Sequence, residues 1–315
     1  MSSFRSSYCV WKAALCAAFF GMLTQPLLAP PLSGSNVKFE EFGSATSAVN
    51  SPSIGAGTSA SKMALSALSN QSPKSQGFQF KDPVISPSGT YRYYDDSSTP
   101  GAFHGHDYSG EFSLDADIYD GLLAGVFYQG LTRHGRNITG TSEDLLSNSV
   151  SLYAAKRFID LINAGVSYNV SFTDHALKGA VAADLDRISN GGTGFVGVSD
   201  KIDQWFLAST GSFTFASDNY ETQPTLDMGL ASWSNEVSYD VVDFFTLGLA
   251  FSYNNYVIQD TFPGVTAVDD DYWIVGPRFR FFPTDQLTVS LDLDTQQGFR
   301  NYDAYIVRLG CNYAF

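Results

Sequence analysis

The chain has 315 residues, a formal net charge of -14, 16% charged residues and 15% aromatic residues. This acidic balance argues against a nucleic-acid partner, which would need clustered Lys and Arg. Low charge together with 28 Gly and many aromatic residues favours strands and tight turns over a helical fold.

Residues 1–29 have the pattern of a secretory signal peptide. Arg5 and Lys12 precede an apolar run over residues 13–29, and no acidic residue occurs before Glu40. We therefore expect this segment to direct export of the chain; a retained membrane anchor is the alternative interpretation.

Residues 30–87 are rich in Ser, Ala, Gly and Pro and show no alternation of apolar and polar positions. This composition predicts a disordered periplasmic linker. Within it, residues 60–69 have the pattern of a short helix capped by Ser59. That helix would be transient in the linker or, alternatively, would lie inside a narrow pore.

From residue 88 onward, apolar and polar residues alternate in long segments, which indicates strands with one apolar face. The clearest are residues 106–119, 162–172, 204–216, 244–254 and 287–294. Strands of soluble proteins are nearer five or six residues, whereas tilted transmembrane strands need about nine to eleven. After the leader, no stretch approaches the roughly 18 to 20 apolar residues of a membrane helix. A membrane fold would therefore be a closed barrel.

The connections between these strands are predicted to alternate in length. Short turns are expected at residues 119–121, 159–161, 199–203, 240–243 and 283–286. Longer loops are expected at residues 133–147, 174–191, 217–227, 258–270 and 297–302. Short turns on one side and long loops on the other are typical of outer-membrane barrels, with the short turns periplasmic. Exposed aromatic residues beside the short turns would form an interfacial girdle.

The predicted fold class is therefore all-β: a transmembrane antiparallel β-barrel of about 12 strands over residues 88–315. An uncertain first strand at 88–96 makes the strand number even. The alternative is a soluble, secreted β-sandwich. One strand fits the alternation less well, because Trp233 and Asn235 share its lipid face.

The alternation places a set of charged side chains on the inward faces. We expect a lumen charge ladder formed by Arg92, Glu111, Asp115, Asp117, Arg278, Arg280, Asp292, Asp294 and Arg308. Opposite charges on neighbouring strands can pair across the sheet. The ladder would either stiffen a narrow barrel or select the solutes that pass through it.

The histidines suggest a third possible function, an enzyme with an active site at the outer rim of the barrel. His104, His106, His134 and His175 all fall in or beside predicted loops, with Asp174 and Ser142 nearby. No nucleophile motif accompanies them, so an enzyme is not expected. No cofactor or metal site is expected either. Apolar positions in loop 174–191, at Leu177, Val181, Leu185 and Ile188, predict a short amphipathic helix.

The last strand ends on an aromatic residue. Leu309, Cys311, Tyr313 and Phe315 alternate along its apolar face, and Cys311 is read as a small hydrophobe. Since Cys9 and Cys16 lie in the leader, no intramolecular disulfide is expected. This end resembles the closing strand of bacterial outer-membrane barrels, whose assembly machinery reads a terminal Phe preceded by alternating apolar residues.

Residues 88–315, the segment before them and the closing LGCNYAF resemble the translocator domain of an autotransporter. That family threads a helix through its barrel to export an amino-terminal passenger, but residues 30–87 are too few for a normal passenger. The resemblance implies the outer membrane of a Gram-negative-type bacterium, with outer-membrane lipid and the barrel assembly machinery as partners. The expected function is a passive pore or structural envelope protein, with a translocator as the alternative.

Overall fold

The computed structural model describes residues 78–96, 103–119, 122–137, 140–159, 162–179, 183–221, 223–260, 271–284, 286–298 and 302–315. The predicted signal peptide 1–29 and most of the predicted linker, including residues 60–69, lie outside this part of the chain. Among the described residues, no helix is long and apolar enough to cross a membrane.

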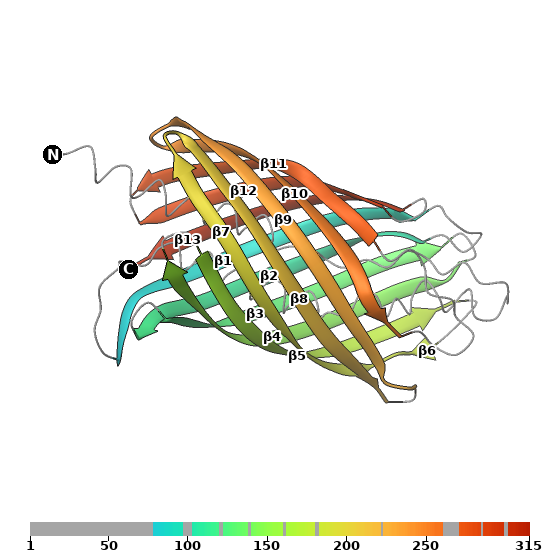
Figure 1. Cartoon of the computed structure of the whole chain (residues 1–315). Helices are drawn as coiled ribbons and strands as arrows, with labels where there is room; N and C mark the ends of the chain where they lie inside the picture. The colour runs from blue at the N-terminus through green and yellow to red at the C-terminus, as the bar shows by residue number, and fades with distance from the viewer. Residues whose placement is uncertain are drawn as a thin grey trace.

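The described chain consists of long antiparallel strands that are tilted in the same sense around a barrel (Figure 1). The strands are β1 (Phe78–Asp96), β2 (Phe103–Tyr119), β3 (Leu122–Asn137), β4 (Ser142–Ile159), β5 (Ile162–Lys178), β6 (Ala183–Asp184), β7 (Arg187–Ile202), β8 (Trp205–Tyr220), β9 (Leu226–Val242), β10 (Phe245–Gln259), β11 (Asp271–Thr284), β12 (Leu287–Gln297) and β13 (Tyr302–Ala314).

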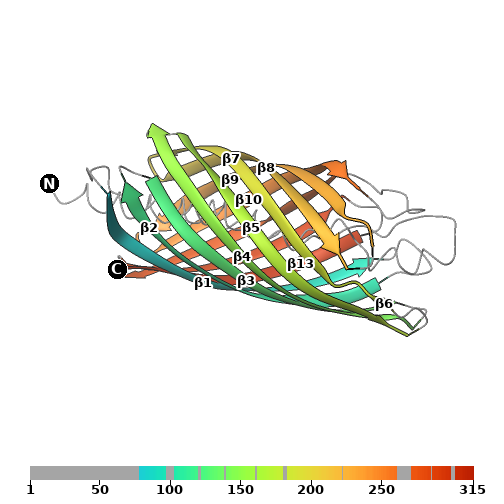
Figure 2. The ribbon, with the colours of Figure 1, turned by 90° about the horizontal axis from the view of Figure 1, so that it is seen from below.

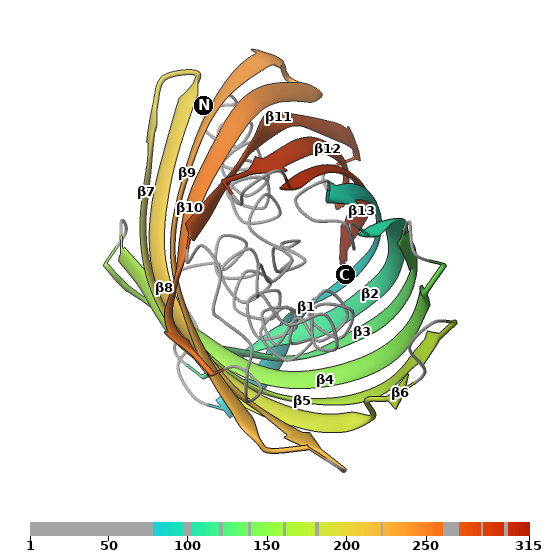
Figure 3. The same cartoon turned by 90° about the vertical axis from the view of Figure 1, so that its right-hand side faces the viewer.

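Twelve strands close the barrel. Each pairs with its neighbours in sequence, β6 is a two-residue extension on β5, and β5 also pairs with β4. The seam joins β1 to β13, where the Phe315 amide donates to the Pro83 carbonyl oxygen at 3.2 Å. Seen from the end, the strands surround one central lumen (Figure 3). Closure pairs the edge strands, so no unpaired edge faces lipid.

The predicted first strand exists and is longer than expected, because β1 begins at Phe78 rather than at residue 88. It starts at the end of the barrel where β13 finishes (Figure 1). An even number of strands therefore leaves both chain ends of the barrel on one side, as the sequence predicts.

Connection lengths differ between the two ends of the barrel. Consecutive strands meet at one end through residues 120–121, 160–161, 203–204, 243–244 and 285–286. At the other end, which we call the mouth, the connections are longer, up to residues 260–270. The predicted asymmetry is therefore present. In the view from below, the strands can be followed between the two ends of the barrel (Figure 2).

Two predicted loops at the mouth are largely strand. Residues 133–147 belong mostly to β3 and β4, and residues 174–191 to β5, β6 and β7. The helix expected in the second loop is wrong, because Leu177 lies in β5 and Ile188 in β7. The apolar positions of this segment are mainly four residues apart. Because four is a multiple of two, such a spacing places residues on one face of a strand as well as on one face of a helix.

Burial along the strands is reversed relative to a soluble protein. On β10, Leu247, Leu249 and Phe251 are 43%, 56% and 40% exposed, whereas the inward Ser252 and Asn254 are buried. The other strands repeat this pattern, with apolar side chains outside and polar side chains inside. An exposed apolar band around a polar interior is what a barrel in lipid requires. A secreted sandwich would bury the apolar face instead.

Candidate functional site: the charged lumen

All nine side chains of the predicted charge ladder face the lumen and are buried, each at most 5% exposed. They come from four neighbouring strands around the seam, β2, β1, β13 and β12, and from β11 beyond them. The structure does not join them into one ladder. It separates them into a cluster on β11–β13, an acidic group on β2, and Arg92, which belongs to a different network.

The β11–β13 cluster comprises Arg278, Arg280, Asp292, Asp294 and Arg308. Strand register builds it, because Asp292 lies directly opposite both Arg278 on β11 and Arg308 on β13. Arg308 Nη1 lies 2.9 Å from Asp292 Oδ2, and Arg280 donates to Asp292 Oδ1. Arg278 Nη1 lies 2.7 Å from Asp294 Oδ1. Two carboxylates thus hold three guanidinium groups in a buried, charge-assisted network.

The acidic group on β2 is held by neutral donors. Ser88 Oγ and Gln129 Nε2 each donate to Glu111, both at 2.9 Å. Tyr153 Oη donates to Asp115 Oδ2 at 2.8 Å. Asp117 is buried beyond Asp115, toward the short turns. Across the seam, Glu111 also lies near enough to Arg308 of β13 for the two opposite charges to interact.

Arg92 instead belongs to a network near the mouth, formed by Arg92, Asp107, Arg133, Glu143 and His175, which we call the mouth network. Asp107 lies opposite both arginines in the register, pairs with Arg92, and lies 2.9 Å from Arg133 Nε. Glu143 Oε1 is 3.9 Å from Arg133 Nη1 and 3.0 Å from His175 Nε2. One chain of buried charged and polar side chains therefore crosses β1, β2, β3, β4 and β5.

Aromatic rings and a further ion pair extend this layer. The guanidinium carbons of Arg92 and Arg133 each lie 5.8 Å from the centre of the Tyr94 ring. On β7 and β8, Arg187 Nε lies 3.2 Å from Asp218 Oδ2 and its guanidinium lies over Tyr220. Arg133, Glu143 and Arg187 are not predicted as lumen residues, because the sequence favours loops at 133–147 and 174–191. Outward positions there, such as His134 and Asp144, are polar like the inward ones, so the sequence carries no alternation that could have identified these strands.

The wall made by β4, β5, β7 and β8 is lined mainly by hydroxyl groups at mid-height. Opposed pairs lie within hydrogen-bond distance: Ser147 Oγ to Thr173 Oγ1 at 2.9 Å, Ser149 Oγ to Ser171 Oγ at 2.6 Å and Thr193 Oγ1 to Thr214 Oγ1 at 2.8 Å. This hydroxyl wall is as buried as the charged cluster but carries no charge in these pairs.

The parts of the rim enzyme do not converge. His175 faces the lumen, whereas the neighbouring Asp174 is exposed on the outer face. Ser142 shares the outward side of β4 with Asp144, so it is also separated from His175 by the barrel wall. Within the described ranges, no group of three or more His, Cys, Asp or Glu side chains is arranged to hold a metal ion.

The other histidines lie on the outer surface of the mouth. His134 Nδ1 is 2.9 Å and Lys178 Nζ is 2.8 Å from the two carboxylate oxygens of Asp144. This exposed triad lies beyond Leu146, the last exposed large apolar residue of β4 toward the mouth, and is therefore outside the apolar band. Hydrogen bonds from Lys178 and His134 lower the pKa of Asp144 below its ordinary value.

The closing strand presents its apolar face outward. Leu309, Tyr313 and Phe315 are 60%, 38% and 63% exposed, and Cys311 is half-buried between them. The Tyr313 and Phe315 rings meet edge to face with centres 4.9 Å apart. Exposed Tyr119, Phe158, Trp205, Phe244 and Phe281 continue the aromatic girdle at the short-turn end. The assembly role of Leu309, Cys311, Tyr313 and Phe315 stays a prediction.

Comparison with known proteins supports the fold. No family model matches the chain, and no curated protein matches it in sequence. The translocator domain of autotransporter NalP from Neisseria meningitidis superposes with a TM-score of 0.61 at 9% identity, covering 81% of this chain and 93% of that one.

Two further solved structures are similar. The transport unit of the autotransporter AIDA-I from Escherichia coli has a TM-score of 0.54 at 12% identity, covering 75% of this chain and 91% of that one. The COG4313 outer-membrane channel from Pseudomonas putida F1 has a TM-score of 0.54 at 11% identity, covering 78% of this chain and 100% of that one. Together with its reversed burial, these likenesses show that the chain has the fold of a closed, twelve-stranded outer-membrane β-barrel.

Proposed function

We propose that the protein is a passive pore in the outer membrane of a Gram-negative-type bacterium, with a narrow lumen that admits small polar solutes. The observation that supports this is the polar lining of the lumen, which carries charged groups on β11–β13 and hydroxyl groups on the opposite wall. A polar lining favours water inside a barrel, whereas an apolar constriction would expel it.

The β11–β13 cluster gives such a pore its electrostatic character. Its five groups carry three positive and two negative charges, and all five project into the lumen from adjacent strands. Long Arg side chains narrow the passage, and their three guanidinium groups favour anions over cations, although the buried Glu236 of β9 lies near enough to Arg278 and Arg280 to offset part of their charge. A rigid barrel that conducts nothing, a structural envelope protein, is the alternative to this pore.

Planar-bilayer recording tests this function. The double variant Arg278→Ala with Arg280→Ala removes two positive charges and two long side chains from one wall. We expect a larger single-channel conductance and a reversal potential shifted toward cation preference. The matched control is Ser147→Ala with Thr173→Val, which changes two buried, uncharged lumen residues on β4 and β5 and should leave ion preference unchanged.

The results of these recordings distinguish a pore from a structural envelope protein. A wild-type protein that inserts as a folded barrel and conducts no ions contradicts the pore and favours the structural envelope role. Conduction with the same ion preference in the double variant and in the wild type removes selectivity by the cluster.

A second candidate function is a translocator barrel. It is favoured by the fold likeness to the NalP translocator domain and by the position of β1, whose first residue lies at the short-turn end. An epitope inserted within residues 30–77 should then reach the cell surface and become accessible to added protease. Protection of that epitope in intact cells would contradict translocation.

A further inference from the structure

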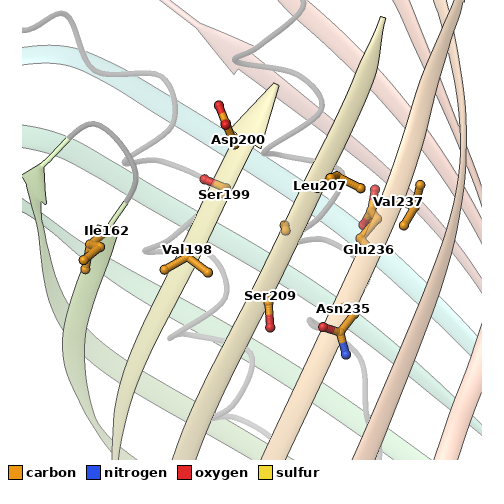
Figure 4. Close-up of a pocket in the computed structure, with 10 residues that line it drawn as sticks. Ile162, Val198, Ser199, Asp200, Leu207, Ser209, Asn235, Glu236 and Val237 are labelled. Carbon is orange, nitrogen blue, oxygen red and sulfur yellow. The ribbon is translucent and has the colours of Figure 1, made fainter. Parts of the chain in front are cut away.

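The lipid-facing wall is interrupted on β7, β8 and β9. Along the outer face of β8, Trp205, Leu207, Phe213 and Phe215 are exposed, but Ser209 and Gly211 stand between them. A hollow of about 460 Å³ opens here, lined by Ile162, Val198, Leu207, Ser209, Asn235 and Val237 (Figure 4). Its sides are apolar apart from the exposed Asp200, which lies toward the short turns, and two uncharged polar side chains, Ser209 and Asn235, face outward into it.

These two polar residues lie within the apolar band. Ser209 is directly opposite Asn235 in the register, and the girdle pair Trp205 and Tyr239 lies four residues nearer the short turns. A strand rises about 3.3 Å per residue and is tilted by about 40°, which places the pair roughly 10 Å inside the girdle. Exposed Phe213 and Phe215 lie on the mouth side of the pair, so lipid chains surround it at this depth.

The two polar groups differ in their partners. Trp233 Nε1 donates to Ser209 Oγ at 3.0 Å, so the hydroxyl and the indole satisfy each other. No hydrogen bond to the Asn235 carboxamide is found among the described residues, and its side chain is half-buried at the edge of the hollow. An amide without partners in hydrocarbon costs several kcal/mol, and lipid chains offer neither donor nor acceptor.

We propose that a second copy of this chain covers the hollow, forming a dimer in which Asn235 pairs with Asn235 of the other copy. Both copies insert with the same orientation, so their twofold axis runs along the membrane normal. A residue near that axis therefore meets its own counterpart at the same depth. A carboxamide has one acceptor and two donors, so two of them form a self-complementary pair.

The surroundings of Asn235 suit such a contact. Ser209 and Gly211 lack bulk, and small residues let membrane-embedded elements approach closely. Val198, Leu207 and Val237 are 47%, 41% and 41% exposed around them and would pack against the same residues of the second copy. A lipid chain could fill the hollow, but it would leave the amide unpaired, which is why a second copy is the better occupant.

Cysteine cross-linking in vesicles of phosphatidylethanolamine and phosphatidylglycerol tests the contact. Val237→Cys, which leaves the Asn235 carboxamide in place, is introduced into a chain whose other cysteines are changed to Ser. The matched control is Leu114→Cys on β2, which is 39% exposed to lipid and lies across the barrel from β8 and β9. Under mild oxidation, we expect a covalent dimer from Val237→Cys and only collisional background from Leu114→Cys. Equal yields from the two positions overturn the proposal.

The role of the amide is tested without a cysteine. Two-colour fluorescence transfer between labelled wild-type barrels, measured against protein-to-lipid ratio, gives the dimer fraction. Asn235→Leu should weaken dimerisation about tenfold, since a polar contact in a membrane is worth about 1–2 kcal/mol. Heat-modifiable migration confirms that the variant is folded. A wild type that stays monomeric at every ratio, or an Asn235→Leu variant that dimerises like the wild type, overturns the proposal. Neither measurement depends on conduction through the lumen.

Discussion

At mid-height, the lumen faces of β11–β13 and of β4, β5, β7 and β8 are both polar and buried, but their side chains are satisfied differently. On the first wall, Asp292 and Asp294 hold three arginines. On the second, neutral hydroxyl groups pair across strands, as Ser147 does with Thr173. The second wall shows that this barrel can satisfy buried polar positions without charge.

The difference bears on what the charges are for. Desolvating ions is expensive, and a buried ion pair is often no more stabilising than a neutral replacement of the same volume. Because neutral hydroxyl pairs are sufficient on the second wall, folding does not require the charges on β11–β13. Those charges therefore point to a role in the lumen. This is the physical basis for placing the selectivity of the proposed pore at β11–β13.

The largest expected effect comes from breaking the charged wall at its centre. Asp292→Ala removes the carboxylate shared by Arg280 and Arg308, and leaves buried guanidinium groups without full compensation. Removing one partner of a buried pair costs about 3–5 kcal/mol. Urea unfolding in lipid vesicles, followed by tryptophan fluorescence, measures the loss. A change below about 1 kcal/mol, the level of an exposed pair, would mean that water screens the cluster.

A smaller effect is expected on the hydroxyl wall. Ser147→Ala leaves the Thr173 hydroxyl without its 2.9 Å partner and should cost about 1 kcal/mol. Adding Thr173→Val removes the orphaned group as well, so the double variant should recover most of the loss. The same unfolding experiment gives the coupling energy. Strictly additive losses would show that the two hydroxyl groups do not depend on each other.

The smallest effect is expected outside the lumen, at the exposed triad on the mouth. Asp144→Asn removes the negative charge that His134 and Lys178 contact, but solvent and salt screen such surface pairs. Because these partners lower the pKa of Asp144, its contribution is complete above the ordinary value of 3.8 and is lost as pH falls through the lowered one. The stability of wild type and Asp144→Asn should therefore converge below about pH 4 and also in high salt. If the stability difference between wild type and Asp144→Asn persists in high salt, the triad is less accessible to water and ions than its exposure indicates.

Much of the architecture is predictable because it depends on local pattern. Alternation along segments such as 244–254 identified strands, and the short turns identified the end of the barrel on which the chain closes. Local pattern does not predict the strands near the mouth, at residues 133–147 and 174–191. There the strands continue past the lipid, so outward positions such as His134 and Asp144 are polar like the inward ones, and the alternation disappears.

The residue pattern of a strand is enough to tell which side chains face inward, since a period of two assigns every residue to one side. Arg92, Asp292 and Arg308 could be placed in the lumen on that basis alone. The partner of each residue follows from the folded barrel, because it depends on the stagger between strands that closing the barrel imposes. That stagger sets Arg92 beside Asp107 rather than beside Glu111, and places Asn235 next to Ser209 at the edge of a hollow in the lipid-facing wall.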